Sequence, residues 1–174
     1  MKNFILLILT TFLLTNYQAQ EVDDIIYVQP GYTHQSFYSM ANGEVANVIN
    51  TDWDLAFEAD AFGVGIRING QIGTQLYMFP DGDIADWDDV DTTDMNTWQR
   101  LYDADTYWYE GAFNRNLDPS DAFDYGWGVY NPITHQVIGD SLYVIKLADG
   151  TARKLWIESM IINEYAFKFA EIDG

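Results

Sequence analysis

Cysteine is absent from the sequence, and basic residues are scarce. Without cysteine the protein has no disulfide, no thiolate ligand for zinc and no thiol nucleophile. Eight lysines and arginines stand against 27 aspartates and glutamates, which gives a net charge of −19 at neutral pH. A field of this sign repels phosphate groups, so neither nucleic acid nor an anionic membrane surface is an expected partner.

Apolar runs long enough to cross a bilayer are also lacking. Lys2, the apolar residues 4–14 and a processing site at residues 17–20 predict a secretory signal peptide over residues 1–20, with a retained anchor as the alternative. We therefore expect export to the extracellular space, the cell surface or the periplasm. No transmembrane segment is expected after the signal is removed.

The remaining segment, residues 21–174, is long enough for one domain that buries a core without disulfides. Aromatic residues make up 16% of the chain, so large side chains are available for packing. No internal repeat, low-complexity tract or long linker divides the segment. A single domain is predicted.

Apolar and polar side chains alternate through the last third of the chain, with Leu155 on the apolar face. The alternating stretches are residues 141–147, 153–160 and 165–169, and an Asp-Gly pair at 149–150 separates the first two. A period of two is typical of strands, and Asp-Gly is typical of tight hairpin turns. The pattern predicts an antiparallel three-stranded meander.

Shorter strand patterns separated by turn residues precede the meander. Hairpins are predicted over residues 35–49, 62–79 and 125–138, with an edge strand at residues 25–28. Trp53, Leu55 and Phe57 share one face of an extended segment and are expected in the core. Residues 106–113 are expected to be extended, with their aromatic side chains in the core.

Two segments depart from the strand pattern. Met95, Trp98 and Tyr102 lie on one helical stripe behind a Thr93 cap, which predicts a helix over residues 93–102. Asp118-Pro119 predicts a short helical turn. The fold class is therefore all-β, built from antiparallel hairpins and a C-terminal meander, with one or two short helices.

Three segments resemble a known family when they are taken in order. They are NTDWDLAF at residues 50–57, IRING at 66–70, and YVIKLADG at 143–150 followed by RKL. In this order they resemble the HmuY-like family of extracytoplasmic proteins from Bacteroidetes, and GWGVYNP at 126–132 resembles its secreted members. The resemblance implies an antiparallel β fold, exposure outside the cell, and haem or a similar porphyrin held by loops.

Haem binding needs axial ligands for the iron. The chain has two histidines, His34 and His135, and both follow turn signals; Met95 is a further candidate. The simpler interpretation is that each histidine is an ordinary turn residue. Met40, Met78 and Met160 fit apolar patterns and are expected in the core.

An acidic run between two predicted elements suggests a calcium site. Its candidate ligands are Asp81, Asp83, Asp86 and Asp88, because calcium prefers several carboxylate or carbonyl oxygens. The spacing lacks the glycine and distal glutamate of an EF-hand. A solvated acidic loop is the alternative interpretation.

Catalytic motifs are not apparent in the sequence, so the protein is predicted not to be an enzyme. Asp103, Asp105 and Glu110 lie near the aromatic residues 107–109, a combination that suits sugar stacking but also arises by chance in so acidic a chain. Two functions remain open. One is a binding protein for a small molecule, with haem as the ligand that the resemblance implies. The other is a structural or adhesive surface module that meets a macromolecule, with calcium as its candidate stabilising ion.

Overall fold

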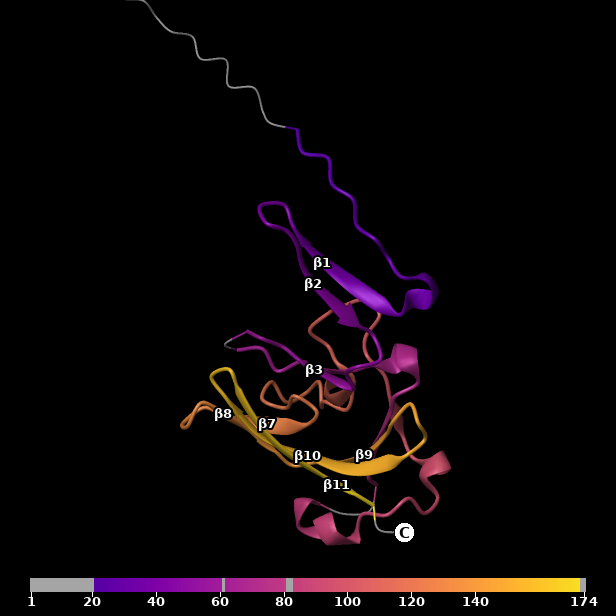
Figure 1. The fold of residues 1–174 in the computed structure, drawn as a ribbon. Coiled ribbons are helices and arrows are strands. Elements are labelled where there is room, and N and C mark those ends of the chain that lie inside the picture. The colour runs from indigo at the N-terminus through magenta and orange to yellow at the C-terminus, as the bar shows by residue number, and fades with distance from the viewer. Residues whose placement is uncertain (1–20, 61, 81–82, 173–174) are drawn as a thin grey trace, which may run out of the picture.

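The computed structural model describes residues 21–60, 62–80 and 83–172, and it confirms the all-β prediction (Figure 1). The predicted signal peptide, residues 1–20, lies outside the described residues. The strands are β1 His34–Ser39, β2 Gly43–Ile49, β3 Leu55–Phe57, β4 Ile66–Ile68, β5 Gln75–Met78, β6 Arg100–Leu101, β7 Gly128–Asn131, β8 Gln136–Gly139, β9 Leu142–Lys146, β10 Ala152–Ile161 and β11 Glu164–Glu171. The 3-10 turns are η1 Pro30–Tyr32, η2 Gly70–Ile72, η3 Ile84–Asp89, η4 Met95–Thr97 and η5 Ala112–Asn114.

Strand β10 is the centre of a curled seven-stranded antiparallel sheet. Its first half pairs with β9 and its second half with β8, whereas β11 pairs along its other edge. Strands β5 and β6 extend the sheet beyond β9, and β7 extends it beyond β8. The predicted C-terminal meander is therefore confirmed as β9, β10 and β11.

Both faces of the sheet are covered at β9, whose first four residues are buried. Tyr143 and Ile145 of β9 face a core that also contains Leu55 and Phe57 of β3. Leu142 and Val144 point the other way, into a second core that includes residues of η3 and η4. Figure 1 shows the same arrangement, with the sheet lying between β3 and the rose-coloured turns.

The hairpin β1–β2 lies outside this layered body. Its strands pair only with each other, and Figure 1 places them beyond β3. Most of their side chains are exposed, among them Phe37, Val45 and Val48. The predicted hairpin is confirmed, but Met40 lies in its exposed turn instead of the core.

The helix predicted over residues 93–102 is wrong. Only Met95–Thr97 forms a 3-10 turn, and Arg100–Leu101 is strand β6, paired with β5. Trp98 has an extended backbone and packs edge-on against Phe79, with 5.5 Å between the ring centroids. Sheet pairing and this aromatic contact outweigh the local helical pattern.

Three further predictions of local structure are also wrong. Residues 62–79 do not form a hairpin, because Ile66–Ile68 pairs with β3 and Gln75–Met78 pairs with β9. Residues 25–28 form no strand, and Pro119-Ser120 forms a turn without a helix. The strand and turn patterns did not reveal which strands pair, because pairing here depends on the shared core.

Candidate functional site

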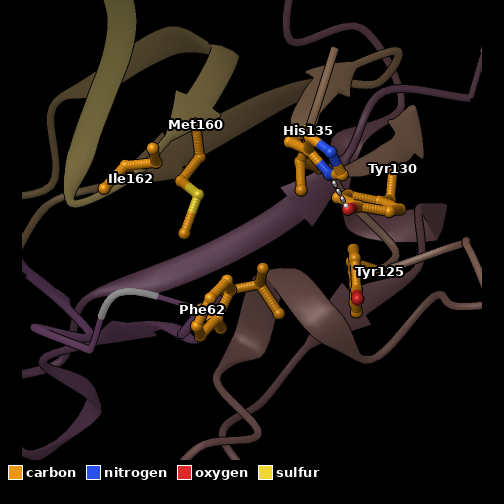
Figure 2. A pocket seen from close by; sticks show the side chains of 8 residues that line it. Phe62, Tyr125, Tyr130, His135, Met160 and Ile162 are labelled. Carbon is orange, nitrogen blue, oxygen red and sulfur yellow. Dashed lines mark hydrogen bonds between the residues drawn. The ribbon is translucent and has the colours of Figure 1, made fainter. Parts of the chain in front are cut away.

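An apolar pocket of about 600 Å³ opens where the β7–β8 hairpin, the end of β10 and the loop before β4 meet (Figure 2). Its walls are mainly aromatic and aliphatic. The lining residues are Phe62, Val64, Tyr125, Tyr130, His135, Val137, Met160 and Ile162. A volume of this size falls within the range of small-molecule sites in proteins.

His135 is held at the pocket by the turn between β7 and β8. Its backbone N–H donates to the carbonyl oxygen of Asn131 at 2.8 Å, and its φ of 57° lies in the left-handed region. The side-chain oxygen of Asn131 accepts from the N–H of Ile133 at 2.9 Å. Asparagine commonly bonds the backbone two residues ahead in this way, so the local sequence fixes where His135 lies.

The imidazole of His135 is paired with the phenol of Tyr130. Nδ1 and the phenol oxygen are 2.7 Å apart and share a hydrogen bond, drawn as a dashed line in Figure 2. When Nδ1–H donates to the phenol, Nε2 keeps a lone pair and becomes a competent metal ligand. Tyr130 is itself stacked on Phe123, with 5.9 Å between ring centroids.

Met160 comes from β10 and is buried, with 4% of its surface exposed, as is Val137 of β8 with 2%. In Figure 2 its thioether extends into the space between Phe62 and the pair formed by His135 and Tyr130. Phe62 is 88% exposed, and Ile162 in the β10–β11 turn is also exposed. Large apolar side chains at such a rim favour contact with a ligand or partner.

Hydrogen bonds fix the loop that carries Phe62 and Val64. The carbonyl oxygen of Val64 accepts from the indole Nε1 of Trp127 at 2.9 Å and from the side-chain amide of Asn114 at 3.0 Å. The hydroxyl of Tyr165 donates to the carbonyl oxygen of Gly63 at 2.8 Å. The pocket wall is therefore anchored to the core.

The structure places the other predicted iron ligands away from this pocket. His34 begins β1, and its Nδ1 contacts the hydroxyl of its neighbour Thr33 at 2.9 Å. The hairpins that carry His34 and His135 lie apart in Figure 1. Met95 packs against the second core, beside Phe79 and Trp98. The two histidines are therefore not brought together, whereas His135 and Met160 line one pocket.

The acidic run contains a structural motif. Asp83 caps η3: its carboxylate accepts from the N–H of Ala85 at 2.7 Å, and that of Asp86 accepts from the N–H of Asp83 at 2.8 Å. Asp88 lies within η3, and Asp81 falls outside the described residues. Within the part of the chain that the structure describes, no three acidic or histidine side chains are grouped to hold a metal ion. The calcium site stays a prediction.

Comparison with family models, curated proteins and solved structures finds no match to this chain. Membership of the HmuY-like family therefore stays a prediction from residue patterns. Over residues 21–60, 62–80 and 83–172, no helix has the length and apolar character to cross a membrane.

Most of the residues that line the pocket were not predicted from the sequence. Tyr125, Tyr130 and Phe62 were interpreted as strand residues, with nothing to distinguish a pocket-lining ring from a core ring. One signal was present: Tyr130 and His135 flank an Asn-Pro turn, and this turn brings them together. The loop before β4 forms the opposite wall of the pocket, and this contact depends on long-range packing that the local sequence does not reveal.

Proposed function

We propose that the protein is a non-enzymatic binding protein that works outside the cytoplasm and takes a flat apolar ligand of the porphyrin class into the pocket around His135. The observation that carries this proposal is the presence of an imidazole and a thioether in the lining of one aromatic pocket of about 600 Å³. Histidine and methionine are the side chains that commonly hold haem iron.

The residues present fit such a ligand in size and chemistry. Haem supplies a flat apolar surface and an iron that accepts a nitrogen or sulfur ligand. His135 and Met160 would hold the iron, and Phe62, Tyr125 and Val137 would contact the macrocycle. None of the eight lining residues is a lysine or arginine, so the propionates of a haem would stay in water at the mouth.

A haemin titration followed by absorbance tests the proposal. We expect the mature protein to give a sharpened Soret band with 1:1 stoichiometry, and the H135A variant to lose it. H34A is the matched control, because it removes the other histidine of the chain from a separate hairpin. M160L keeps the volume of the side chain but removes the thioether, so a band shift in that variant would identify the second ligand.

The result that would overturn the proposal is an absorbance spectrum equal to that of free haemin, or one that H135A leaves unchanged. Equal losses in H34A and H135A would also contradict it, because the pocket contains one of these histidines.

A second candidate is an adhesive or structural module at the cell surface. It is favoured by the hairpin β1–β2, whose strands pair only with each other and expose Phe37, Val45 and Val48. Exposed strand edges and apolar side chains are features of protein–protein contact. This function needs no iron, so a protein that fails to bind haemin but binds a surface macromolecule would favour it.

A further inference from the structure

The loop between β6 and η5 displays three consecutive aromatic side chains to solvent. Trp108 is 79% exposed, and Tyr107 and Tyr109 are each more than half exposed. The prediction that these rings lie in the core is therefore wrong. Tyr107 and Tyr109 stack on each other, with centroids 5.4 Å apart and planes at 29°. We call residues 107–109 the aromatic platform.

Arg67 of β4 contacts the platform through hydrogen bonds to its backbone and through the ring of Trp108. Its Nη1 donates to the carbonyl oxygen of Trp108 at 2.9 Å and to that of Tyr107 at 3.4 Å. Its guanidinium carbon also lies 4.5 Å from the centre of the Trp108 ring, a cation–π geometry. Arg67 also forms an ion pair with Asp103 at 3.5 Å. Because Asp103 lies at the start of the same loop, this contact connects Arg67 to both ends of the loop segment that it holds.

Close backbone packing fixes the two sides of the loop. Gly111 lies so near β4 that a Cβ atom there would collide with the carbonyl oxygen of Ile66. The carboxylate of Asp103 accepts from the N–H groups of Ala112 at 2.8 Å and Ile68 at 3.3 Å. Within the loop, the N–H of Ala104 donates to the carbonyl oxygen of Glu110 at 3.0 Å. These contacts fix the backbone of the loop that carries the exposed rings, so the platform is formed without a bound partner.

Two hollows adjoin the platform. The first has a volume of about 520 Å³, and its lining includes Tyr102, Asp105, Thr106 and Arg115. The second has a volume of about 270 Å³, with Glu58, Asp60 and Tyr109 in its lining. Aromatic rings beside carboxylates, a hydroxyl and a guanidinium provide both stacking surfaces and hydrogen-bonding groups.

We infer that the aromatic platform binds a neutral polysaccharide, whose sugar rings stack on Trp108 and Tyr107 and whose hydroxyls meet the polar groups of the adjoining hollows. Sugar rings have apolar faces and polar edges, which match rings flanked by donors and acceptors. Nucleic acid bases also stack on aromatic rings, but the net charge of −19 and the carboxylates in both hollows oppose any polyanion.

A polymer fits this surface better than a single sugar. The platform and its two hollows form a run of contacts along one loop, from Asp105 in the first hollow to Tyr109 in the second. Each contact is weak when it is exposed to water, so a chain of several sugar units gains affinity by meeting several at once. This gives the second candidate function a chemical partner. The second hollow shares Phe62 and Val64 with the pocket around His135, but residues 107–109 do not line that pocket.

Native gel electrophoresis with polysaccharide cast into the gel tests this inference. The probes are soluble neutral β-glucan, mannan and xylan, with polygalacturonate as the acidic probe. We expect at least one neutral polymer to retard the protein, and W108A to raise the dissociation constant about tenfold. W108F, which keeps an aromatic ring, should recover most of the binding. Y27A removes an equally exposed tyrosine outside the platform and should bind like the unchanged protein.

H135A separates this inference from the proposed porphyrin site, because it should lose haemin and keep the polysaccharide. The inference is overturned if no neutral polymer retards the protein, if W108A and Y27A bind equally, or if polygalacturonate binds more tightly than every neutral polymer. Haemin titration of W108A completes the comparison, and the Soret band is expected to be unchanged.

Discussion

Asn114 is a buried residue that joins three backbone groups, and it is 5% exposed. Its amide nitrogen donates to the carbonyl oxygens of Val64 at 3.0 Å and Tyr125 at 3.1 Å, and its oxygen accepts from the N–H of Ile66 at 3.2 Å. Two of these partners, Val64 and Tyr125, line the pocket. One side chain therefore connects the core to the candidate site.

Replacing Asn114 with leucine keeps the branched shape of the side chain but removes the hydrogen-bond partner of the N–H of Ile66 and of the carbonyl oxygen of Tyr125, whereas the carbonyl oxygen of Val64 keeps its bond to Trp127. Each such group costs about 1–3 kcal/mol, so N114L should lower the free energy of unfolding by about 3 kcal/mol in urea titrations. The matched control is N47L, because Asn47 is exposed on β2 and its side chain bonds to the carboxylate of Glu44 at the surface. Its effect should stay within about 0.5 kcal/mol. A loss below about 1 kcal/mol in N114L would contradict the role given to this residue.

Two tyrosines make the protein sensitive to alkaline pH. Burial raises the pKa of Tyr143 above its usual value, and burial together with the Glu58 carboxylate raises the pKa of Tyr165. The unfolded chain releases these protons near pH 10, while the folded protein retains them. Above pH 10 the unfolded state therefore binds fewer protons, and the free energy of unfolding falls as pH rises.

This fall amounts to roughly 1.4 kcal/mol per tyrosine for each pH unit above the unfolded pKa. Urea titrations at pH 9 and pH 11 should show it, and Y165F should reduce the pH-dependent part by about half. Y165F also loses the hydrogen bond to Gly63, so it should already be less stable at pH 9. The slope is the readout that matters: an equal slope in Y165F and the unchanged protein would contradict the assignment.

At the scale of elements, the hairpin β1–β2 and the strand β9 differ most in burial. Four of the five residues of β9 are buried, whereas none of β1 or β2 is. An isolated two-stranded hairpin is marginally stable in water. Local opening should therefore be easy in residues 34–49 and rare in residues 142–146.

Hydrogen exchange measured by mass spectrometry checks this difference. Amides of residues 34–49 should exchange within seconds to minutes, and those of β9 and the first half of β10 should remain protected for hours. Equal protection of the two regions would mean that something covers the hairpin in solution. Adding a polysaccharide that binds the aromatic platform serves as an internal control, since it should protect residues 105–111 and leave the hairpin unchanged.

The elements that could be predicted from the sequence are those whose signal is local. Alternation through β10 and β11, with Asp149-Gly150 before them, is enough to define the meander. The pairing of β4 with β3 and of β5 with β9 was missed, because it depends on which apolar faces share a core. For the same reason the helix predicted around Trp98 was wrong: this residue packs against Phe79 in an extended segment.

The candidate site could be predicted only in part. His135 was identified because histidine is rare in the chain and follows a turn signal. Its partner Met160 comes from β10, and the opposite wall comes from a loop more than sixty residues upstream of the hairpin. The prediction of burial was also wrong for residues 107–109. Their aromatic content suggested a place in the core, but the rings are exposed and Trp108 packs on Arg67.

On the scale of the whole molecule, one charge sign dominates. The net charge is −19, and loss of Lys2 with a signal peptide would make it one unit more negative. The ion pairs between described residues are three: Arg67 with Asp103, Arg115 with Glu110, and Arg153 with Glu171. Most carboxylates therefore repel one another across the surface, which favours solubility and opposes compaction.

Added salt should stabilise the protein by screening this repulsion. Raising NaCl from 20 to 200 mM shortens the Debye length from about 20 Å to about 7 Å, and a gain of about 1 kcal/mol would raise the Tm by about 2–4 °C. A Tm that falls or does not change would contradict the dominance of repulsion.

Calcium at matched ionic strength extends this measurement to the acidic run near η3. A site that includes Asp83 or Asp86 should give a further rise in Tm with CaCl₂ that MgCl₂ does not reproduce, because calcium accepts more oxygen ligands in a flexible geometry. D88N is the variant to compare, since it removes a candidate ligand without touching the capping contacts of Asp83 and Asp86. Identical melting in the two salts would leave screening alone as the effect of cations and remove calcium from the second candidate function.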